Sequence, residues 1–328
     1  MKNPLSSKLE RLDEIAADFI GNTPLIEVSD ENREGARILA KLEWHNLISL
    51  SVKDRTVHGM LRAAIKEAIN KEKDSLHILE YGGGSLAIGL AILGKLLDIP
   101  MTLVLPGFVP EDFSKQLTLY GARVLKGDPE RNFLGAIEKA QEIAREEEGL
   151  TFLHQHRNPA NPKAFETGMA VETLSQLDQM GIDSVDAWTA AIGSGGTLIG
   201  VYNGLVKKYP SLALYCITPK EMPYGTSQAP TTKPKLWGSG GTGCGIKQRC
   251  VETMEEKITG HFYYALEEAY HGMAEYYKKT GVLIGSSSAA NLLAAKTIAK
   301  DLDKDKVVLT VFPALAVTRD TENLKDYL

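Results

Sequence analysis

The chain has 328 residues, of which 43% are apolar and 24% are charged, values that are ordinary for a globular protein with a full hydrophobic core. Its length predicts two domains or one large domain. The formal net charge of -5 argues against nucleic acid or an anionic membrane surface as the main partner.

Short apolar runs alternate with segments of helical periodicity from residue 76 onward. The first series predicts, in order, a strand at 76–81, a helix at 86–97, a strand at 101–105, a helix at 110–119, a strand at 123–125 and a helix at 132–147. Strands and helices in alternation form a parallel sheet that is covered by helices. This part of the chain is therefore expected to be an α/β unit.

The alternation starts again after residue 160. Residues 219–245 are rich in Pro, Gly, Thr and Ser and have no clear period, which predicts a long loop that is functional or mobile. Two α/β units with a ligand-binding cleft between them are the expected architecture. The elements predicted in this second series are a helix at 162–180, a strand at 185–192, a helix at 198–208, a strand at 212–217, helices at 264–279 and 288–302, and a strand at 307–312.

The sequence also indicates the cellular compartment. Residues 1–25 carry charges throughout and lack the apolar stretch of a signal peptide. The longest apolar run, 88–97, is interrupted by a lysine and is too short to span a bilayer. The three cysteines, Cys216, Cys244 and Cys250, have no zinc-type spacing and are expected to be free thiols. We therefore expect a cytoplasmic protein without a membrane partner.

Lys53 is a candidate for covalent chemistry, because it stands at the head of a helix-like segment within the stretch SVKDR. A buried amine at the positive end of a helix resists protonation and becomes a nucleophile. The aldehyde of pyridoxal phosphate (PLP) is the common partner of such an amine, with which it forms a Schiff base. A solvated surface charge is the ordinary state of a single lysine, so the assignment depends on motifs elsewhere in the chain.

Three glycine-rich turns precede helical segments. Residues 193–197 (GSGGT) follow a buried strand and suit a phosphate, because backbone N–H groups converge at a helix start; a tight turn without a ligand is the alternative. Residues 82–87 (GGGSLA) fit the dinucleotide fingerprint of an oxidoreductase, although the next strand lacks the expected acidic residue. Residues 285–288 (GSSS) predict either a helix N-cap or a hydroxyl that faces a cofactor ring nitrogen.

Five stretches, in order along the chain, resemble motifs of the cysteine synthase / cystathionine β-synthase family of PLP-dependent enzymes, which have the tryptophan-synthase-β-like fold (fold type II). The stretches are GNTPL at 21–25, KLE at 41–43 with Asn46, SVKDR at 51–55, NPANP at 158–162 with ETG at 166–168, and GSGGT at 193–197.

This resemblance implies an α/β fold of two doubly wound open-sheet domains with the cofactor cleft between them. Residues 40–150 would form a smaller domain that carries the Schiff-base lysine and the substrate carboxylate loop. Residues 1–39 and 151–328 would form a larger domain that carries the phosphate loop and the serine at the ring nitrogen.

The resemblance also implies the site residues, with pyridoxal 5'-phosphate as the cofactor. Lys53 would carry the cofactor and act as the acid and base at the substrate α-carbon. The other residues expected to bind the cofactor are Ser85, Gly193, Ser194, Gly195, Gly196, Thr197 and Ser287. The residues expected to bind the substrate are Gly82, Gly83, Gly84, Ser85, Leu86 and Gln155.

The implied reaction is β-elimination and β-replacement on an O-activated serine or a related amino acid, through an aminoacrylate intermediate. A neutral serine at the pyridine nitrogen favours α,β-elimination, since it leaves the ring a moderate electron sink. The partners would be an amino-acid substrate and a nucleophile, and the expected assembly is a homodimer. Two alternatives remain open. One is elimination alone, which gives a keto acid, and the other is a non-catalytic regulatory subunit with the same fold.

The chain departs from the family pattern at four places. Residues 82–87 replace the loop TSGNTG, Leu47 stands in a loop with one extra residue where relatives have Pro, and Phe312-Pro313-Ala314-Leu315, which include Ala314-Leu315, lie where relatives read PDSG. His154-Gln155-His156 replace a QQF-like stretch; two histidines could bind a metal ion, but no third ligand is evident, and we expect no metal. These changes predict that PLP is kept and that the substrate or nucleophile is specialised.

Overall fold

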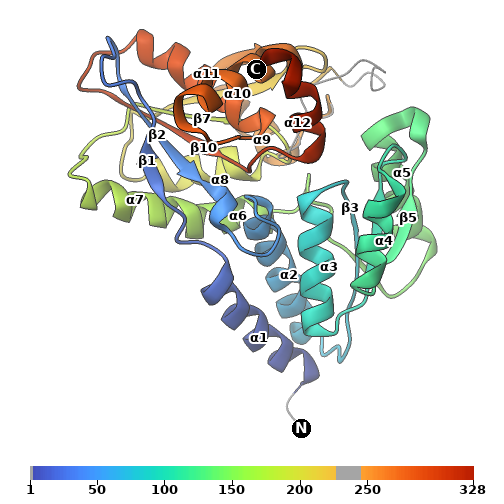
Figure 1. Ribbon diagram of the computed structural model, residues 1–328. Helices are drawn as coiled ribbons and strands as arrows, with labels where there is room; N and C mark the ends of the chain where they lie inside the picture. The colour runs from blue at the N-terminus through green and yellow to red at the C-terminus, as the bar shows by residue number, and fades with distance from the viewer. Residues whose placement is uncertain (1–2, 227–244) are drawn as a thin grey trace.

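The structure is a computed structural model that describes residues 3–226 and 245–328 (Figure 1). Its strands form two separate sheets. The larger sheet contains, in spatial order, β1 (Leu25–Glu27), β2 (Arg37–Leu42), β10 (Val307–Phe312), β7 (Ala187–Ala191), β8 (Ala213–Pro219) and β9 (Ile258–Tyr264). The smaller sheet contains β5 (Arg123–Lys126), β4 (Met101–Leu105), β3 (His77–Tyr81) and β6 (Leu150–Phe152).

Every strand pair in the two sheets is parallel except β1 with β2. All residues of β4 and β10 are buried, as expected for parallel strands that helices cover on both faces. β9 lies at an edge, and its residues alternate between half-buried and exposed. This arrangement confirms the predicted α/β class with two open, mainly parallel sheets.

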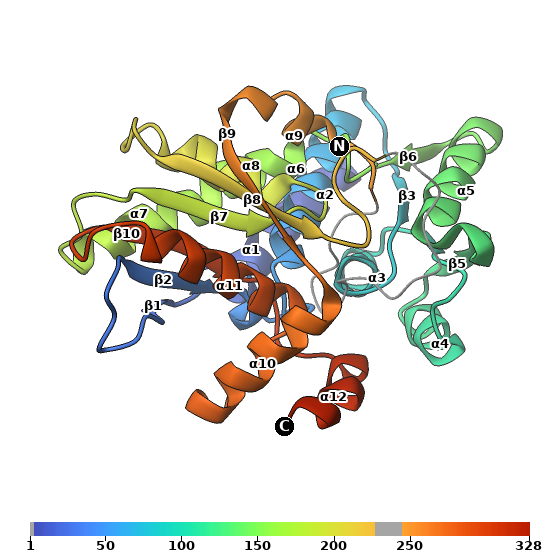
Figure 2. The same ribbon diagram turned by 90° about the horizontal axis from the view of Figure 1, so that it is seen from above.

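Helices cover both faces of each sheet. Figure 2 shows α10 and α11 on one face of the larger sheet and α7 and α8 on the other. The helices are α1 (Pro4–Phe19), α2 (Lys53–Asn70), α3 (Ser85–Leu97), α4 (Glu111–Leu119), α5 (Asn132–Glu146), α6 (Ala160–Ala164), α7 (Ala170–Gln179), α8 (Gly196–Leu205), α9 (Arg249–Glu252), α10 (Leu266–Thr280), α11 (Ser286–Lys300) and α12 (Thr318–Leu324). Among the residues that the structure describes, no helix is both long and apolar enough to cross a lipid bilayer.

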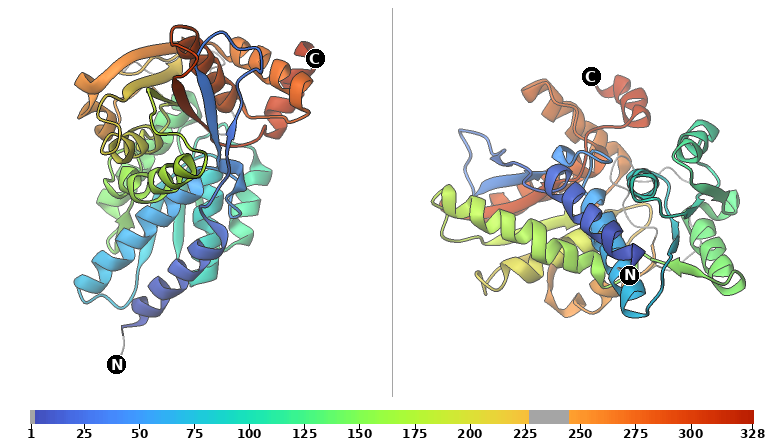
Figure 3. Two further views of the ribbon diagram at one scale, coloured as in Figure 1. Left: turned by 90° about the vertical axis from the view of Figure 1, so that its left-hand side faces the viewer. Right: turned by 90° about the horizontal axis from the view of Figure 1, so that it is seen from below.

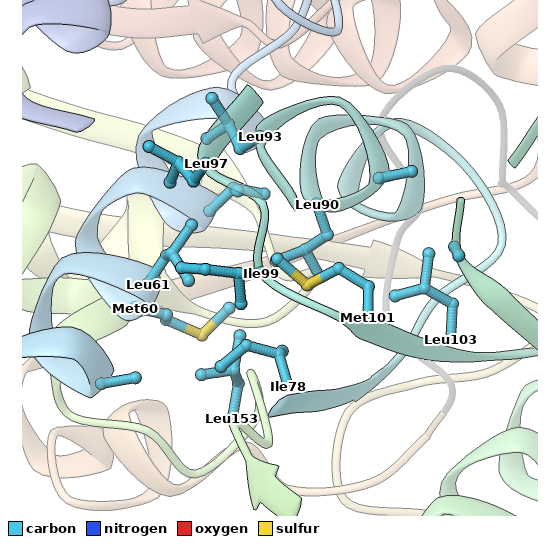
Figure 4. Packing of buried hydrophobic residues seen from close by; sticks show 14 of the residues in the cluster. Met60, Leu61, Ile78, Leu90, Leu93, Leu97, Ile99, Met101, Leu103 and Leu153 are labelled. Carbon is cyan, nitrogen blue, oxygen red and sulfur yellow. The ribbon is translucent and has the colours of Figure 1, made fainter. Parts of the chain in front are cut away.

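The core of the smaller sheet has two halves. On one face, side chains of α2 and α3 such as Met60, Leu61 and Leu90 pack against Ile78 and Met101 of the strands (Figure 4). α1 lies alongside α2 at the end of the molecule far from the larger sheet and adds its apolar face to this core (Figure 3). α5 covers the opposite face of the sheet.

The chain passes from one sheet to the other near residue 50. β2 belongs to the larger sheet and ends at Leu42, whereas α2 begins at Lys53 and packs on the smaller sheet. β6, at 150–152, is the last strand of the smaller sheet. The domain boundaries at residues 40 and 150 stay a prediction; the sheets place 40–42 in the larger sheet and 150–152 in the smaller one.

Candidate active site

Lys53 is the first residue of α2, and its side chain lines a cavity together with the glycine-rich loop and Ser287. At the start of the helix the Ser51 Oγ accepts a hydrogen bond from the Lys53 backbone N–H at 3.2 Å. Burial lowers the pKa of the Lys53 amine to about 8, since removal from water disfavours the ammonium form. The amine is therefore available as a nucleophile near neutral pH.

Asp54 holds the loop that precedes Lys53. Its carboxylate accepts hydrogen bonds from the backbone N–H groups of Ile48 and Ser49 at 3.0 and 2.9 Å, and from the Ser49 hydroxyl. Within this loop Leu50 has a φ of +54°, which is uncommon for a residue with a side chain. The bonded carboxylate thus holds the loop that is predicted to contain the extra residue.

Two segments that are predicted to depart from the family pattern contact each other beside Lys53. Ser51 forms an isolated antiparallel bridge with Ala314, and the Val52 N–H donates to the Pro313 carbonyl at 2.9 Å. The loop that is predicted to contain an extra residue is therefore bound directly to the segment that is predicted to replace PDSG. Pro313 also lines the cavity of Lys53, so both changes bear on the same wall of the site.

A buried ion-pair network lies behind α2 and uses three of the recognised motifs. Arg55 donates from Nε to Glu43 Oε2 and from Nη1 to Glu172 Oε1, each at 2.7 Å. Lys41 donates to Glu172 Oε2 at 3.0 Å and to the Thr23 carbonyl. Burial alone would raise the pKa of Glu172, but Arg55 and Lys41 lower it to about 2. These motif residues position α2, and none of them lines the cavity.

The GSGGT loop joins β7 to α8 and is closely packed. Gly195 has a φ of +82°, and a Cβ on it would lie 2.6 Å from Val251 Cγ2. A Cβ on Gly196, the first residue of α8, would lie 2.1 Å from Asn161 Oδ1. Asn161, from the NPANP motif, donates to the Ser194 Oγ at 2.8 Å. The loop therefore presents backbone N–H groups at a helix N-terminus, which attracts anions.

Ser287 is the second residue of α11, and its hydroxyl is buried. Within the part of the chain that the structure describes, the Ser287 Oγ has no hydrogen-bond partner. The next hydroxyl along the helix, that of Ser288, donates to the Ala314 carbonyl at 2.9 Å. A buried hydroxyl without a partner costs free energy unless a ligand satisfies it. Because Ser287 lines the Lys53 cavity, its hydroxyl suits a ligand with a polar ring atom.

The predicted substrate loop lies at the end of β3 and outside this cavity. Ser85 is the first residue of α3, and the first backbone hydrogen bond of that helix runs from the Ile88 N–H to the Gly84 carbonyl at 3.2 Å. Its first turn thus has backbone N–H groups for an anion. Leu86 is buried in the core and Gln155 donates from Nε2 to the Tyr81 carbonyl at 2.9 Å.

The sequence-predicted residues therefore form two groups. Those that line the Lys53 cavity are Lys53 itself, Gly193, Ser194, Gly195, Thr197 and Ser287, with Gly196 inside the same loop. Those beside β3 that do not line it are Gly82, Gly83, Gly84, Ser85, Leu86 and Gln155. Their roles stay predictions.

Sequence reasoning missed several residues around the site. Asn161 bonds the Gln155 carbonyl as well as the glycine-rich loop, and Gln248 donates to the Gly193 carbonyl at 2.7 Å. Asn161 had a signal, since it belongs to a recognised motif, whereas Gln248 had none. Tyr81, whose hydroxyl lies near His156 and His154, was also missed.

The chain is similar to known proteins over most of its length. A family model described as pyridoxal-phosphate dependent enzyme matches residues 16–314. The chain belongs to this family. It is 33% identical over 299 residues to a cysteine synthase of Staphylococcus aureus, with 90% of this chain and 92% of the relative covered.

Two solved structures show the same fold. O-acetyl serine sulfhydrylase isoform 3 from Entamoeba histolytica has a TM-score of 0.80 and 26% identity, with 95% of this chain and 91% of that chain covered. The O-acetylserine dependent cystathionine β-synthase of Helicobacter pylori has a TM-score of 0.75 and 26% identity, with 91% and 94% covered. The protein is a PLP-dependent enzyme of cysteine synthase-like type, which confirms the predicted family, fold class and cofactor and replaces the dinucleotide interpretation of residues 82–87.

Proposed function

We propose that this enzyme catalyses β-replacement on an O-activated L-serine, with O-acetylserine as the first donor to test. The observation that carries the proposal is that one cavity contains a lysine of lowered pKa, a glycine-rich helix N-terminus and a serine hydroxyl without a hydrogen-bond partner among the described residues. The printed names of the relatives, cysteine synthase and O-acetylserine-dependent enzymes, support the donor.

The residues present fit PLP. Lys53 would bind the cofactor aldehyde, and residues 193–197 would bind its phosphate, because glycines at 195 and 196 leave no room for a side chain. The Ser287 hydroxyl, which has no partner in residues 3–226 and 245–328, would gain a hydrogen bond by donating to the pyridine nitrogen. Ser85, at the start of α3, would contribute a hydroxyl to the cofactor from the smaller domain.

The chemistry then depends on Lys53 as a proton carrier. When bound, PLP supplies a ring that withdraws electrons from the substrate α-carbon. The Lys53 Nζ would take the proton from that carbon as the β-leaving group departs, and would return a proton after the nucleophile has added. A pKa of about 8 suits both steps, since general acid and base catalysis is most effective near the working pH.

The substrate carboxylate would lie at the first turn of α3, where backbone N–H groups and the helix dipole favour an anion. Gly84 has open space beside it in the described part of the chain, where no atom lies within 4 Å of a Cβ built on this glycine. Such space supports a donor or nucleophile larger than those of housekeeping cysteine synthesis. We also propose the homodimer and the two domains with boundaries at 40 and 150.

The experiment is to purify the protein with PLP and to add O-acetylserine, O-phosphoserine, L-serine and L-cysteine in turn. We expect a visible cofactor band that Lys53→Ala loses, and release of the leaving group from one donor only in the protein with Lys53. A fully active Lys53→Ala protein would refute the proposal.

Product analysis separates the alternatives. An amino acid formed only with added bisulfide or thiol supports β-replacement. A keto acid and ammonia as the sole products, with or without a nucleophile, would support elimination alone. A cofactor spectrum that no amino acid perturbs would support the regulatory subunit.

A further inference from the structure

Three side chains that the proposed chemistry does not use form a hydrogen-bonded chain beside the site. The Tyr81 hydroxyl, at the end of β3, lies 2.7 Å from the Nδ1 of His156 and 3.0 Å from the Nδ1 of His154. Tyr81 and His156 are 1% and 6% exposed, whereas His154 is half-buried. The chain of bonds therefore runs from the interior to an imidazole that reaches solvent.

The hydrogen bonds of this chain point the same way at any one time, and the tautomers of the two histidines decide which way. A tyrosine hydroxyl has one proton, so Tyr81 donates to one imidazole and must accept from the other. Each neutral imidazole has one N–H and one lone pair, so the three groups form a path along which protons can move one step at a time. His154 has a φ of +54°, and strained backbone of this kind persists where the surroundings require the side chain at one position.

The inner end of the chain is linked to the proposed active site through neighbouring groups. His156 and Gln155 line a second cavity, of about 430 Å³, which shares no lining residue with the Lys53 cavity and lies against Ile199 of α8 and Cys250. The Gln155 carbonyl accepts from Asn161, whose amide also bonds the glycine-rich loop. Burial lowers the pKa of His156 most, and the positive charge of Lys53 lowers it further. The imidazole therefore lies within electrostatic reach of the reacting lysine.

We propose that His156, Tyr81 and His154 form a proton relay that removes the proton from the incoming nucleophile during β-replacement. The inference rests on the proposed function and adds a substrate class to it. The nucleophile would be one whose attacking atom still carries a proton, such as a neutral thiol.

The relay transfers one proton from the thiol to water. In the starting state the His156 Nδ1–H donates to the Tyr81 oxygen, and the Tyr81 O–H donates to the His154 Nδ1. The S–H bond of the thiol breaks as its proton moves to the His156 Nε2 and its sulfur bonds to the substrate β-carbon. The His156 Nδ1 proton moves to Tyr81, the Tyr81 proton moves to the His154 Nδ1, and the His154 Nε2 proton leaves to water. All three side chains end neutral.

The relay explains why a buried histidine can act here. Burial lowers the pKa of His156 to about 3, so it does not hold a proton for long. A proton that arrives must therefore be passed on at once, which requires the Tyr81 hydroxyl. Loss of that hydroxyl is expected to be as damaging as loss of the imidazole itself.

The test compares two sulfur nucleophiles with the holoenzyme. Bisulfide is largely anionic at about pH 8 and needs no base, whereas 2-mercaptoethanol is largely a neutral thiol. We expect Tyr81→Phe and His156→Phe each to slow replacement by 2-mercaptoethanol about 100-fold, the usual size of a general-base contribution. The rate with bisulfide is expected to change little, and the double variant should lose no more than either single variant.

Phe133→Leu is the matched control, because its ring packs on both Tyr81 and His156, at 6.0 Å between centroids in each case, and carries no transferable proton. It should leave the ratio of the two rates unchanged. Equal losses with both nucleophiles in the relay variants, or no loss with the thiol, would overturn the relay. Leaving-group release without nucleophile reports the proposed function separately: if the wild-type enzyme shows none, that function is refuted and the relay with it.

Discussion

Glu80 makes the stability of this protein depend on pH in an unusual direction. Its side chain is fully buried in β3; Oε1 accepts a long hydrogen bond of 3.4 Å from the Gln155 N–H, and Oε2 has no hydrogen-bond partner among the described residues. Burial raises the pKa of this carboxyl to about 8, above the 4.5 of an ordinary glutamate. Glu80 is therefore protonated in the folded protein at neutral pH.

The sign of the effect follows from linkage. The folded state holds a proton that the unfolded state releases, so the free energy of unfolding falls as pH rises from about 4.5 to about 8. A pKa rise of this size corresponds to about 5 kcal/mol across the whole window, at about 1.4 kcal/mol per unit. Glu80→Gln is neutral at every pH and removes this dependence.

We expect Glu80→Gln to be more stable than the wild type at about pH 8.5 and no more stable at about pH 5. At low pH the extra N–H of the amide is an unpaired buried donor and costs about 1–3 kcal/mol. Urea unfolding followed by circular dichroism at several pH values, with equal PLP occupancy, measures the difference between the two proteins. Other titrating groups cancel in that difference. A difference that stays constant between pH 5 and 8.5 would refute the reasoning.

Three further predictions concern the site and its support. Gly196→Ala should weaken PLP binding at least about 10-fold, measured by titration, since its Cβ would lie 2.1 Å from a side-chain oxygen. The control Gly168→Ala, whose Cβ would lie 3.6 Å from the nearest atom, should not weaken binding. Equal PLP affinities of the two variants would count against a closely fitted loop. Arg55→Met should lower the free energy of unfolding, measured with a chemical denaturant, by about 3–5 kcal/mol because it leaves buried carboxylates unpaired. The control Arg62→Met, at a partly exposed ion pair, should lower it by under about 1 kcal/mol. Ser287→Ala should leave the apo-protein at least as stable in thermal unfolding, because the hydroxyl has no partner in the part of the chain that the structure describes. The same substitution should reduce the stabilisation by PLP, and an unstable apo-protein would contradict this prediction.

The sequence predicted those parts of the fold that local patterns encode. The elements expected at 101–105, 198–208 and 307–312 correspond to β4, α8 and β10 with ends that differ by at most three residues. The helix expected at 162–180 is α6, a π-helical turn at Phe165–Met169 and α7. Of the long loop expected at 219–245, residue 219 ends β8 and residues 227–244 lie outside the described part of the chain.

Elements with weak patterns were missed. α1 was seen only as a charged N-terminus, and the short strands β1 and β6, with β2, gave no clear signal. β9 was missed because an edge strand exposes every second residue, including Tyr263, and so lacks a continuous apolar run.

Site residues that belong to a short sequence motif could be predicted. Contacts between residues far apart in the sequence could not. The lysine, the glycine-rich loop and Ser287 each belong to a short stretch, and these residues line one cavity. The contact of Tyr81 with His156 joins residues 75 positions apart. It exists because β3 pairs with β6, with Leu79 opposite Phe152, and that register cannot be read from either strand alone.

The bridge between Ser51 and Ala314 has a consequence for protein engineering. The loop before Lys53, which is predicted to be one residue longer than in relatives, is joined through the backbone to the segment after β10, so the conformation of each depends on the other. A chimera that takes only one of these two segments from a relative would place a loop of one length beside a segment that fits a loop of a different length. Recombination between this enzyme and its relatives should therefore exchange 46–51 and 313–316 as one unit.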